Sequence, residues 1–337
     1  MRHVNIPIFI PHEGCPNACV FCNQRSISGT VCFDKSRVDG LIAEALSTIS
    51  SDDTCEIAFF GGSFTGIDRS LMLYLLGVAQ KYVDEGRVQS IRLSTRPDYI
   101  NDEIISDLKK FSVRTVELGL QSLSDEVLRA SGRGHDATCA EIACKSLKDA
   151  GFELIGQMMI GLPCSTVESE IMTARKIIEM GADGARVYPT VVFFDTELAE
   201  MTRRGEYAPL TNEQAVMRTK EVLKVFDASG VPCIRVGLCA SDNLADESHV
   251  MAGANHPSIG ELARSEVYFD SICAEVEKQG IRGGELVVYV AKGCVSKAVG
   301  QKRANKEKIC QKYGFKRVKV LEKNHILGYN IVLEHII

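Results

Sequence analysis

The sequence predicts an α/β protein built on a parallel sheet, followed by a small C-terminal α+β domain. Short apolar, strand-like runs alternate six times with segments of helical periodicity. That alternation is typical of parallel strands joined by crossover helices. Six such units are too few for a complete eight-fold barrel. The last stretch of the chain has the pattern strand, basic helix, strand, strand, which predicts a separate smaller unit.

The predicted strands are runs of apolar residues, and turn-forming residues end several of them. The run at 55–60, for example, is stopped by Gly61 and Gly62. The strands are expected at 4–10, 55–60, 88–93, 114–120, 152–160 and 185–194, with a further one at 232–238. Apolar residues at helical spacing predict the helices between them. These helices are expected from Val38, from Leu71, and over 102–111, 124–150 and 166–180.

The chain is expected to divide into three parts. Residues 1–195 would form the sheet with its helices, and residues 196–280 a helical extension that completes the substrate side. Residues 281–337 would form the small basic domain. Its elements are expected at 285–291 (strand), about 299–313 (helix), 315–321 (strand) and 326–334 (strand).

Bulk composition is that of an ordinary globular protein, with 45% apolar and 25% charged residues among 337. No secretion signal is expected at the N-terminus, and no apolar run approaches the roughly 20 residues that a membrane-spanning helix needs. Thirteen cysteines without such a signal favour a reducing cytoplasm over a disulfide framework. We therefore expect a cytoplasmic protein with no membrane partner.

Charge is distributed unevenly along the chain. Residues 271–337 carry a net charge of +7, whereas the rest carries −12. A basic segment on an acidic body predicts contact with an anion such as RNA, although a solvated lysine-rich helix explains the charge equally well. DNA is not an expected partner. The candidate phosphate contacts are Lys297, Lys302, Arg303, Lys306, Lys316 and Arg317.

Three cysteines near the N-terminus, Cys15, Cys19 and Cys22, form a C-x3-C-x2-C run. Thiolates are the usual ligands of iron–sulfur clusters, and three ligands would leave one iron of a four-iron cluster open. A structural zinc site normally has a second ligand pair, and none of comparable spacing is apparent, although His12 is near. Three buried free thiols are a further alternative, which the proline and asparagine after Cys15 disfavour because they suggest a loop.

The cysteine spacing, with Phe21 directly before the third cysteine, resembles the radical S-adenosylmethionine (SAM) superfamily. The resemblance implies a partial (β/α)6 barrel of TIM type, open on one side. It also implies an enzyme with a [4Fe–4S] cluster on Cys15, Cys19 and Cys22 and with SAM on the open iron. A one-electron reductant of flavodoxin or ferredoxin type would then cause cleavage of SAM to a 5′-deoxyadenosyl radical.

Further segments at the ends of predicted strands, where α/β barrels place their sites, resemble SAM-binding motifs of this family. Gly61-Gly62-Ser63 resembles its GGE-type motif, and relatives often have an acidic residue where Ser94 stands. The SAM contacts that the resemblance implies are Phe21, Gly61, Gly62, Ser63, Ser94, Thr95, Gln121, Arg133, Gln157, Met159 and Tyr188.

Each of these motifs also has a purely structural interpretation. Paired glycines often only turn the chain, and methionines such as Met159 fill cores. Glu117, inside an apolar strand, needs a partner because an unpaired buried charge is expensive, and a structural pair with an arginine would supply one. Cys233 and Cys239, on either side of Arg235, are candidates for a second redox role.

The substrate is predicted from resemblance alone. The stretches 94–99, 117–135 and 255–265 resemble the radical SAM subunit of Elongator, which modifies the wobble uridine of tRNA. Gln121 and Arg133 also match the oxygen-independent coproporphyrinogen III oxidases. Because the sequence ends soon after the predicted barrel, we expect no acetyltransferase domain. The predicted function is reductive cleavage of SAM by a radical SAM enzyme that modifies RNA, specifically tRNA. Two alternatives stay open: a small-molecule or tetrapyrrole substrate, and a non-catalytic iron–sulfur protein.

Overall fold

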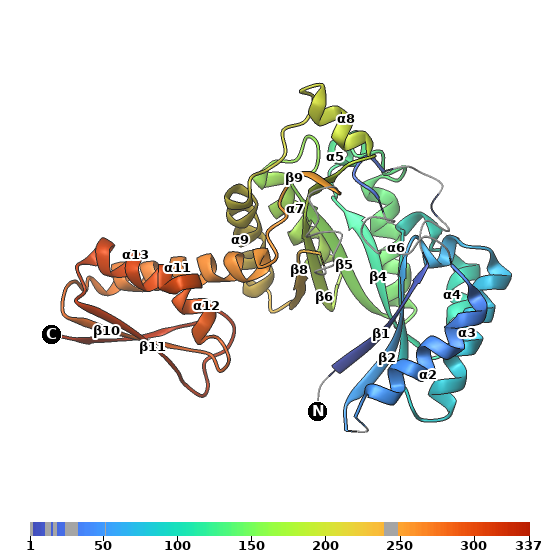
Figure 1. The fold of residues 1–337 in the computed structure, drawn as a ribbon, viewed down its shortest axis with the longest axis horizontal. Helices are drawn as coiled ribbons and strands as arrows, with labels where there is room; N and C mark the ends of the chain where they lie inside the picture. The colour runs from blue at the N-terminus through green and yellow to red at the C-terminus, as the bar shows by residue number, and fades with distance from the viewer. Residues whose placement is uncertain (1–2, 11–14, 16–18, 24–32, 51, 239–248) are drawn as a thin grey trace.

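The computed structural model describes residues 3–10, 15, 19–23, 33–50, 52–238 and 249–337. Its main body is a seven-stranded sheet in the order β1-β2-β3-β4-β5-β6-β8, with every pairing parallel. The strands are β1 (His3–Ile10), β2 (Thr54–Gly61), β3 (Ser90–Thr95), β4 (Val113–Gln121), β5 (Glu153–Ile160), β6 (Gly184–Pro189) and β8 (Cys233–Val236). The sheet curls into a half-barrel with β1 and β8 at its edges (Figure 1). The predicted partial barrel is thus confirmed, with the run at 232–238 as its seventh strand.

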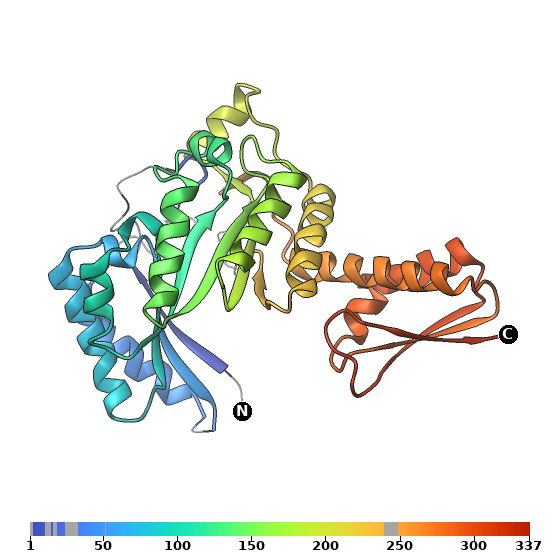
Figure 2. The same ribbon diagram turned by 180° about the vertical axis from the view of Figure 1, so that it is seen from behind.

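Helices cover the convex face of the half-barrel (Figure 2). They are α2 (Val38–Thr48), α3 (Arg69–Asp84), α4 (Asp102–Leu108), α6 (Ala137–Asp149), α7 (Val167–Glu179) and α9 (Asn212–Ala228). Two shorter helices, α5 (Asp125–Ala130) and α8 (Glu197–Arg203), lie at the top of Figure 1. Several begin at a side chain that accepts a hydrogen bond from the third backbone N–H of the helix, as Asp68, Asn101 and Asp136 do. Such caps satisfy N–H groups that have no partner inside the helix.

The strand predicted at 185–194 is in fact two strands. β6 stays in the parallel sheet, whereas β7 (Val191–Phe193) pairs antiparallel with β9 (Val250–Gly253). Thr190 separates them, because its backbone N–H and its hydroxyl both donate to the carbonyl of Ile160, at 2.9 and 2.7 Å. These bonds hold Thr190 at the end of β5, and the chain leaves the sheet there.

A chain of charged side chains crosses the interior of the half-barrel. Glu117 of β4 is fully buried and accepts hydrogen bonds from Arg92 of β3 (3.0 Å), Arg186 of β6 (2.9 Å) and Gln157 of β5 (2.8 Å). Arg92 also pairs with Glu56 of β2 at 2.9 Å. These bonds join five neighbouring strands, and they provide the arginine partner that a buried glutamate in this strand requires.

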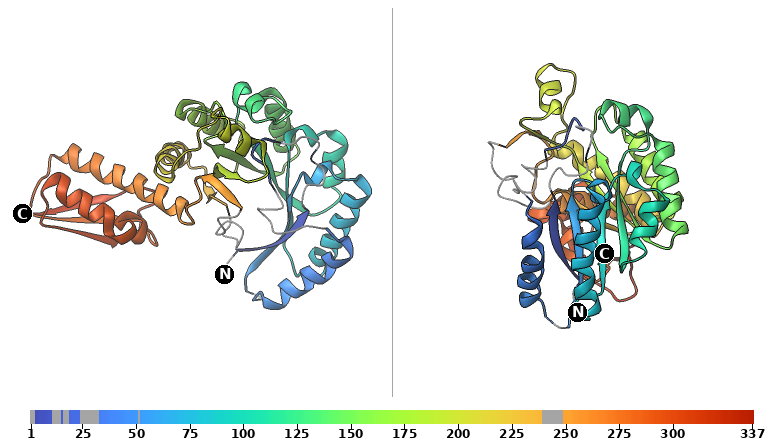
Figure 3. Two further views of the ribbon diagram at one scale, coloured as in Figure 1. Left: turned by 45° about the horizontal axis from the view of Figure 1, so that its top comes forward. Right: turned by 90° about the vertical axis from the view of Figure 1, so that its right-hand side faces the viewer.

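The C-terminal part is a three-stranded sheet in the order β11-β10-β12, joined to the half-barrel by the long helix α11 (Ile259–Gln279) (Figure 3). Its strands are β10 (Glu285–Val290), β11 (Arg317–Glu322) and β12 (Val332–Ile336). The first half of α11 packs with α9, and its second half belongs to the core of the small sheet. The domain boundary at 280/281 stays a prediction.

The prediction of a single basic helix at about 299–313 is wrong. Two helices, α12 (Val295–Val299) and α13 (Ala304–Tyr313), are separated by a turn. Lys302 (φ 50°) and Arg303 (φ 67°) have left-handed backbone conformations, as does Gly314 after α13. A helix cannot continue through such residues. The last strand also begins later than predicted, because Gly328 (φ 59°) lies in a turn before β12.

Replacing Glu117 with alanine should destabilise the protein strongly. Arg186 would be left buried without a carboxylate partner, and Arg92 would keep only Glu56, and breaking a buried pair costs about 3 to 5 kcal/mol. Urea unfolding followed by circular dichroism measures the loss. The matched control is Glu141→Ala, which removes a glutamate on α6 paired with Lys176 at the surface and should cost less than about 1 kcal/mol. Equal losses in the two variants would contradict this assignment.

Candidate active site

The cysteine loop follows β1 and is fastened to two neighbouring segments. The backbone N–H of Val20 donates to the carbonyl of Ser131 after α5 (3.1 Å), and Leu198 of α8 donates to the carbonyl of Val20 (2.8 Å). The N–H of Cys22 donates to the carbonyl of Cys19 at 3.0 Å, which makes a tight turn. Cys19 is buried within this arrangement.

Two guanidinium groups converge on the sulfur of Cys19. Nη1 of Arg133 lies 3.5 Å from Sγ, and Nη1 of Arg96 lies 3.9 Å from it. Arg96 also donates to the backbone carbonyl of Arg133 at 2.6 Å, and Arg133 donates to the carbonyl of Gly119. The two arginines therefore brace one another. Positive charge at this distance attracts an anionic group bound there.

The three cysteines are the predicted ligands of the cluster. Within the part of the chain that the structure describes, no group of three or more His, Cys, Asp or Glu side chains is arranged to hold a metal ion. Burial raises the pKa of the Cys15 thiol, and Arg96 and Arg133 offset this only in part. The donors themselves, three thiols beside two guanidinium groups, fit an anionic iron–sulfur cluster.

A buried acceptor without a donor lies beside this group. Gln121, at the end of β4, has a left-handed backbone (φ 67°), and its Oε1 has no hydrogen-bond partner. An added Cβ at Gly119 would lie 3.0 Å from Nε2 of Gln121 and 3.4 Å from Nη2 of Arg133. An unpaired buried acceptor costs free energy. A ligand with an N–H or O–H group, such as the amino or ribose hydroxyl groups of SAM, would satisfy it.

The glycine loop after β2 is packed tightly against the end of β1. Gly61 has φ 118°, and an added Cβ would lie 2.4 Å from the carbonyl oxygen of Ile10, so this position requires glycine. The N–H of Gly62 donates to the same carbonyl at 2.9 Å. Ser63 and Thr95 are buried, and their hydroxyls bond to each other at 2.8 Å. These hydroxyls join the loops after β2 and β3, and their contact with SAM stays a prediction.

Four other predicted residues lie along β3, β5 and β6. Ser94 is opposite Glu117 in the register of β3 and β4, and Gln157 donates to Glu117. Met159 is opposite Tyr188 in the register of β5 and β6. The hydroxyl of Tyr188 accepts from Arg186 at 3.4 Å. All four are only partly buried.

Phe21 has different neighbours from the other predicted contacts. It packs against an apolar cluster that includes Val192, Leu198 and Tyr207. In this position it anchors the cysteine loop to β7 and α8, and its role in binding SAM stays a prediction. Cys233 bonds through Sγ to the carbonyl of Arg235 (3.4 Å), and burial raises the pKa of its thiol to about 11. Its predicted partner Cys239 lies outside the described residues.

Arg96 was not predicted from the sequence, although a signal for it exists. It follows Thr95 directly and is buried, with only 3% of its surface exposed. Its guanidinium makes two bonds to Asp98, at 2.9 and 2.8 Å. An Arg-x-Asp spacing at the end of a barrel strand is the pattern of such a fork-to-carboxylate pair. That pair fixes the direction in which Arg96 points, toward Cys19.

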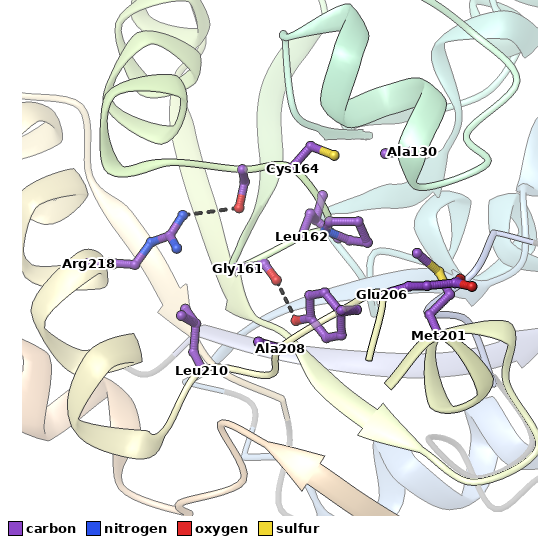
Figure 4. A pocket seen from close by; sticks show the side chains of 12 residues that line it. Ala130, Gly161, Leu162, Cys164, Met201, Glu206, Ala208, Leu210 and Arg218 are labelled. Carbon is purple, nitrogen blue, oxygen red and sulfur yellow. Dashed lines mark hydrogen bonds between the residues drawn. The ribbon is translucent and has the colours of Figure 1, made fainter. Parts of the chain in front are cut away.

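A cavity of about 290 Å³ lies outside the predicted set, at the loop after β5 (Figure 4). Arg218 of α9 donates to Ser165 and to Glu170, and Tyr207 donates to the carbonyl of Gly161 at 2.6 Å. Burial raises the pKa of Glu170 even though Arg218 is its partner. These bonds attach α9 and the segment after α8 to the end of β5, so the cavity borders the site without containing its cysteines.

His135 makes the stability of the apoprotein depend on pH. Its pKa is lowered to about 4 by burial and by Arg133, and its Nε2 accepts from Nε of Arg133 at 3.3 Å. Between pH 6.5 and 4 the unfolded chain binds a proton that the folded chain does not, so stability should fall as pH falls, by on the order of 3 kcal/mol. Urea unfolding across this range measures it. His135→Gln should flatten the profile, and superimposable profiles would refute the assignment.

Two known proteins are similar to this chain in sequence. The chain is 34% identical over 225 residues to the tRNA uridine(34) acetyltransferase of Methanocaldococcus jannaschii, covering 65% of this chain and 38% of that protein. It is 30% identical over 179 residues to Elongator complex protein 3 of Saccharomyces cerevisiae, covering 47% and 32%. The chain thus spans about a third of the length of these relatives.

Solved structures support the fold. The archaeal Elp3 of Methanocaldococcus infernus superposes with a TM-score of 0.61 at 21% identity, covering 83% of this chain and 64% of that one. Coproporphyrinogen III oxidase from Escherichia coli superposes with a TM-score of 0.51 at 17% identity, covering 68% and 53%. Among the described residues, no helix is long and apolar enough to cross a membrane.

Family models match most of the half-barrel and its extension. The model of the radical SAM superfamily matches residues 9–177, which is half of the chain, and that of the radical SAM C-terminal domain matches residues 182–268. The first match includes the cysteine run, the glycine loop, Gln121 and Arg133. The chain is therefore an enzyme of the radical SAM superfamily.

Proposed function

We propose that this enzyme holds a [4Fe–4S] cluster on Cys15, Cys19 and Cys22 and cleaves SAM there to modify RNA, most specifically tRNA. When bound, such a cluster would supply the electron for reductive cleavage of SAM, and so the radical chemistry that acts on the substrate, and Cys15, Cys19 and Cys22 would hold it. The observation that supports this best is Cys19 between two guanidinium groups, beside the unsatisfied acceptor of Gln121.

The chain's own residues would bind and orient the reactants. Arg96 and Arg133 would balance the negative charge of the thiolates and of a SAM carboxylate. Gln121 would accept a hydrogen bond from SAM, and the contact of Gly61 with SAM stays a prediction. The concave wall carrying Tyr188 would keep water away from the radical.

RNA is proposed as the substrate from the relatives and from charge. The relatives with about 30% identity are named as a tRNA uridine(34) acetyltransferase and as Elongator complex protein 3. Residues 271–337 carry a net charge of +7, which suits phosphates. A one-electron reductant of flavodoxin or ferredoxin type would be the protein partner.

Reconstituted enzyme should form 5′-deoxyadenosine from SAM under anaerobic conditions with dithionite. Cys22→Ala should abolish the product because a cluster ligand is lost, whereas Cys310→Ala, in α13 of the small domain, should retain it. Liquid chromatography measures the nucleoside. Transcribed tRNA should increase its yield. No product from the wild type would overturn the SAM proposal, and stimulation by a tetrapyrrole in place of tRNA would overturn the RNA proposal.

Gln121→Ala should weaken SAM binding without harming the fold. Losing one hydrogen bond of about 1.4 kcal/mol corresponds to roughly tenfold in Kd. The apoprotein should melt at the same or a higher temperature, because the variant removes a buried acceptor that has no partner. Equilibrium dialysis of reconstituted protein and thermal melting of apoprotein are the two measurements. A lower melting temperature with unchanged SAM affinity would show a purely structural role.

A further inference from the structure

A cleft of about 300 Å³ lies where α11, α12 and the turn before α13 meet. It is lined by Glu261, Ser265, Ser296, Lys297, Val299, Gly300, Gln301, Lys302 and Arg303. Three of these side chains are cationic, two carry hydroxyl groups, and only one is acidic. Cations and hydroxyl donors in this proportion are the groups that bind phosphate oxygens.

The lysines and arginines of the small domain fall into two groups. In one group the charge is neutralised by a nearby carboxylate. These pairs are Lys308 with Glu266 (2.9 Å), Lys312 with Glu277 (3.1 Å) and Lys319 with Glu285 (3.2 Å). In the other group, Lys297, Lys302 and Arg303 make no side-chain ion pair with any residue that the structure describes. Arg282, Lys292, Lys306, Lys316, Arg317 and Lys323 likewise make no ion pair with a described residue. What distinguishes Lys297, Lys302 and Arg303 is that they line one cleft together.

The wall of the cleft is held firmly against α11. Asn305 is fully buried, and its Nδ2 donates to the carbonyl and the hydroxyl of Ser265 and to the carbonyl of Ala298. An added Cβ at Gly300 would lie 3.1 Å from the hydroxyl of Ser265, so the turn leaves no room there for a side chain. A wall fixed in this way loses little conformational entropy when a ligand binds.

The cleft also lies close to the open edge of the half-barrel. α11 begins at the carboxyl end of the edge strand β8, where an added Cβ at Gly260 would lie 2.9 Å from Cβ of Val236. Ser265 is six residues after Ile259, which is about 9 Å along the helix axis. In Figure 1, α12 lies at the end of the small domain that is nearer the barrel. The cleft thus lies near the edge strand β8.

We propose that this cleft binds the phosphodiester backbone of a single-stranded segment of the RNA substrate. The proposal rests on the proposed function. The cleft holds only one or two phosphate groups at a time, and its basic lining suits a backbone that is free to bend into it. It gives affinity and direction, and the chemistry stays with the cysteine site.

The test is fluorescence anisotropy of the whole chain with a short labelled single-stranded RNA at several salt concentrations. Lys302→Gln with Arg303→Gln should weaken binding about tenfold and reduce the slope of log affinity against log salt by about 1.4, or 0.7 for each lost phosphate contact. The matched control, Lys308→Gln with Lys312→Gln, removes the same charge from paired positions and should change affinity less than about twofold. Lys297→Gln tests the same wall if the double variant melts early.

Each outcome decides the proposal. Equal weakening by the two double variants, or none by the cleft variant, would overturn it. Duplex RNA bound as tightly as single-stranded RNA, or RNA displaced fully by an equal concentration of inorganic pyrophosphate, would overturn the single-strand assignment. Deoxyadenosine formation without RNA is measured in parallel and should be unchanged in the cleft variant. Wild-type protein that binds RNA here but forms no deoxyadenosine would contradict the proposed function alone.

Discussion

The buried carboxylate of Glu117 is the constraint on which the half-barrel depends. It has no access to water, and Arg92 and Arg186 both face it and balance its charge. Arg92 comes from the neighbouring strand β3 and Arg186 from β6, two strands away on the other side, so the two ion pairs span four neighbouring strands. Arg186 also lies over the ring of Phe60, with its guanidinium carbon 5.5 Å from the ring centroid. The interior of the half-barrel thus contains ion pairs and apolar contacts side by side.

The cysteine site, at the ends of the strands, also contains buried arginines that are held by fixed partners. There the arginines, Arg96 and Arg133, are held by Asp98 and by backbone carbonyls, and they present positive charge to a sulfur. Because both arginines are braced before any ligand arrives, the charge does not need to be reorganised on binding. The unsatisfied oxygen of Gln121 is the part of this arrangement that the protein leaves incomplete.

Much of this architecture is predictable because it depends on local patterns. Apolar runs such as the one ended by Gly61 mark the strands, and the three cysteines stand together in the chain. Arg96 is different, because its importance arises from Cys19, 77 residues away, and no local pattern encodes that contact. The break between α12 and α13 was missed because Lys302 and Arg303 are ordinary helix formers. Their left-handed backbone is imposed by the packing of Gly300 and Asn305 on Ser265.

The helix α11 belongs to two hydrophobic cores at once. Ile259, Ala263 and Val267 pack on the side of α9, and Tyr268, Ile272 and Val276 pack under the small sheet. It therefore fixes both the distance and the rotation between the half-barrel and the small domain. Inserting one residue between Val267 and Tyr268 would move the small domain by about 1.5 Å and turn it by about 100° around the helix axis. The length of this helix, more than the sequence of either part, sets which face the small domain presents to the mouth of the barrel.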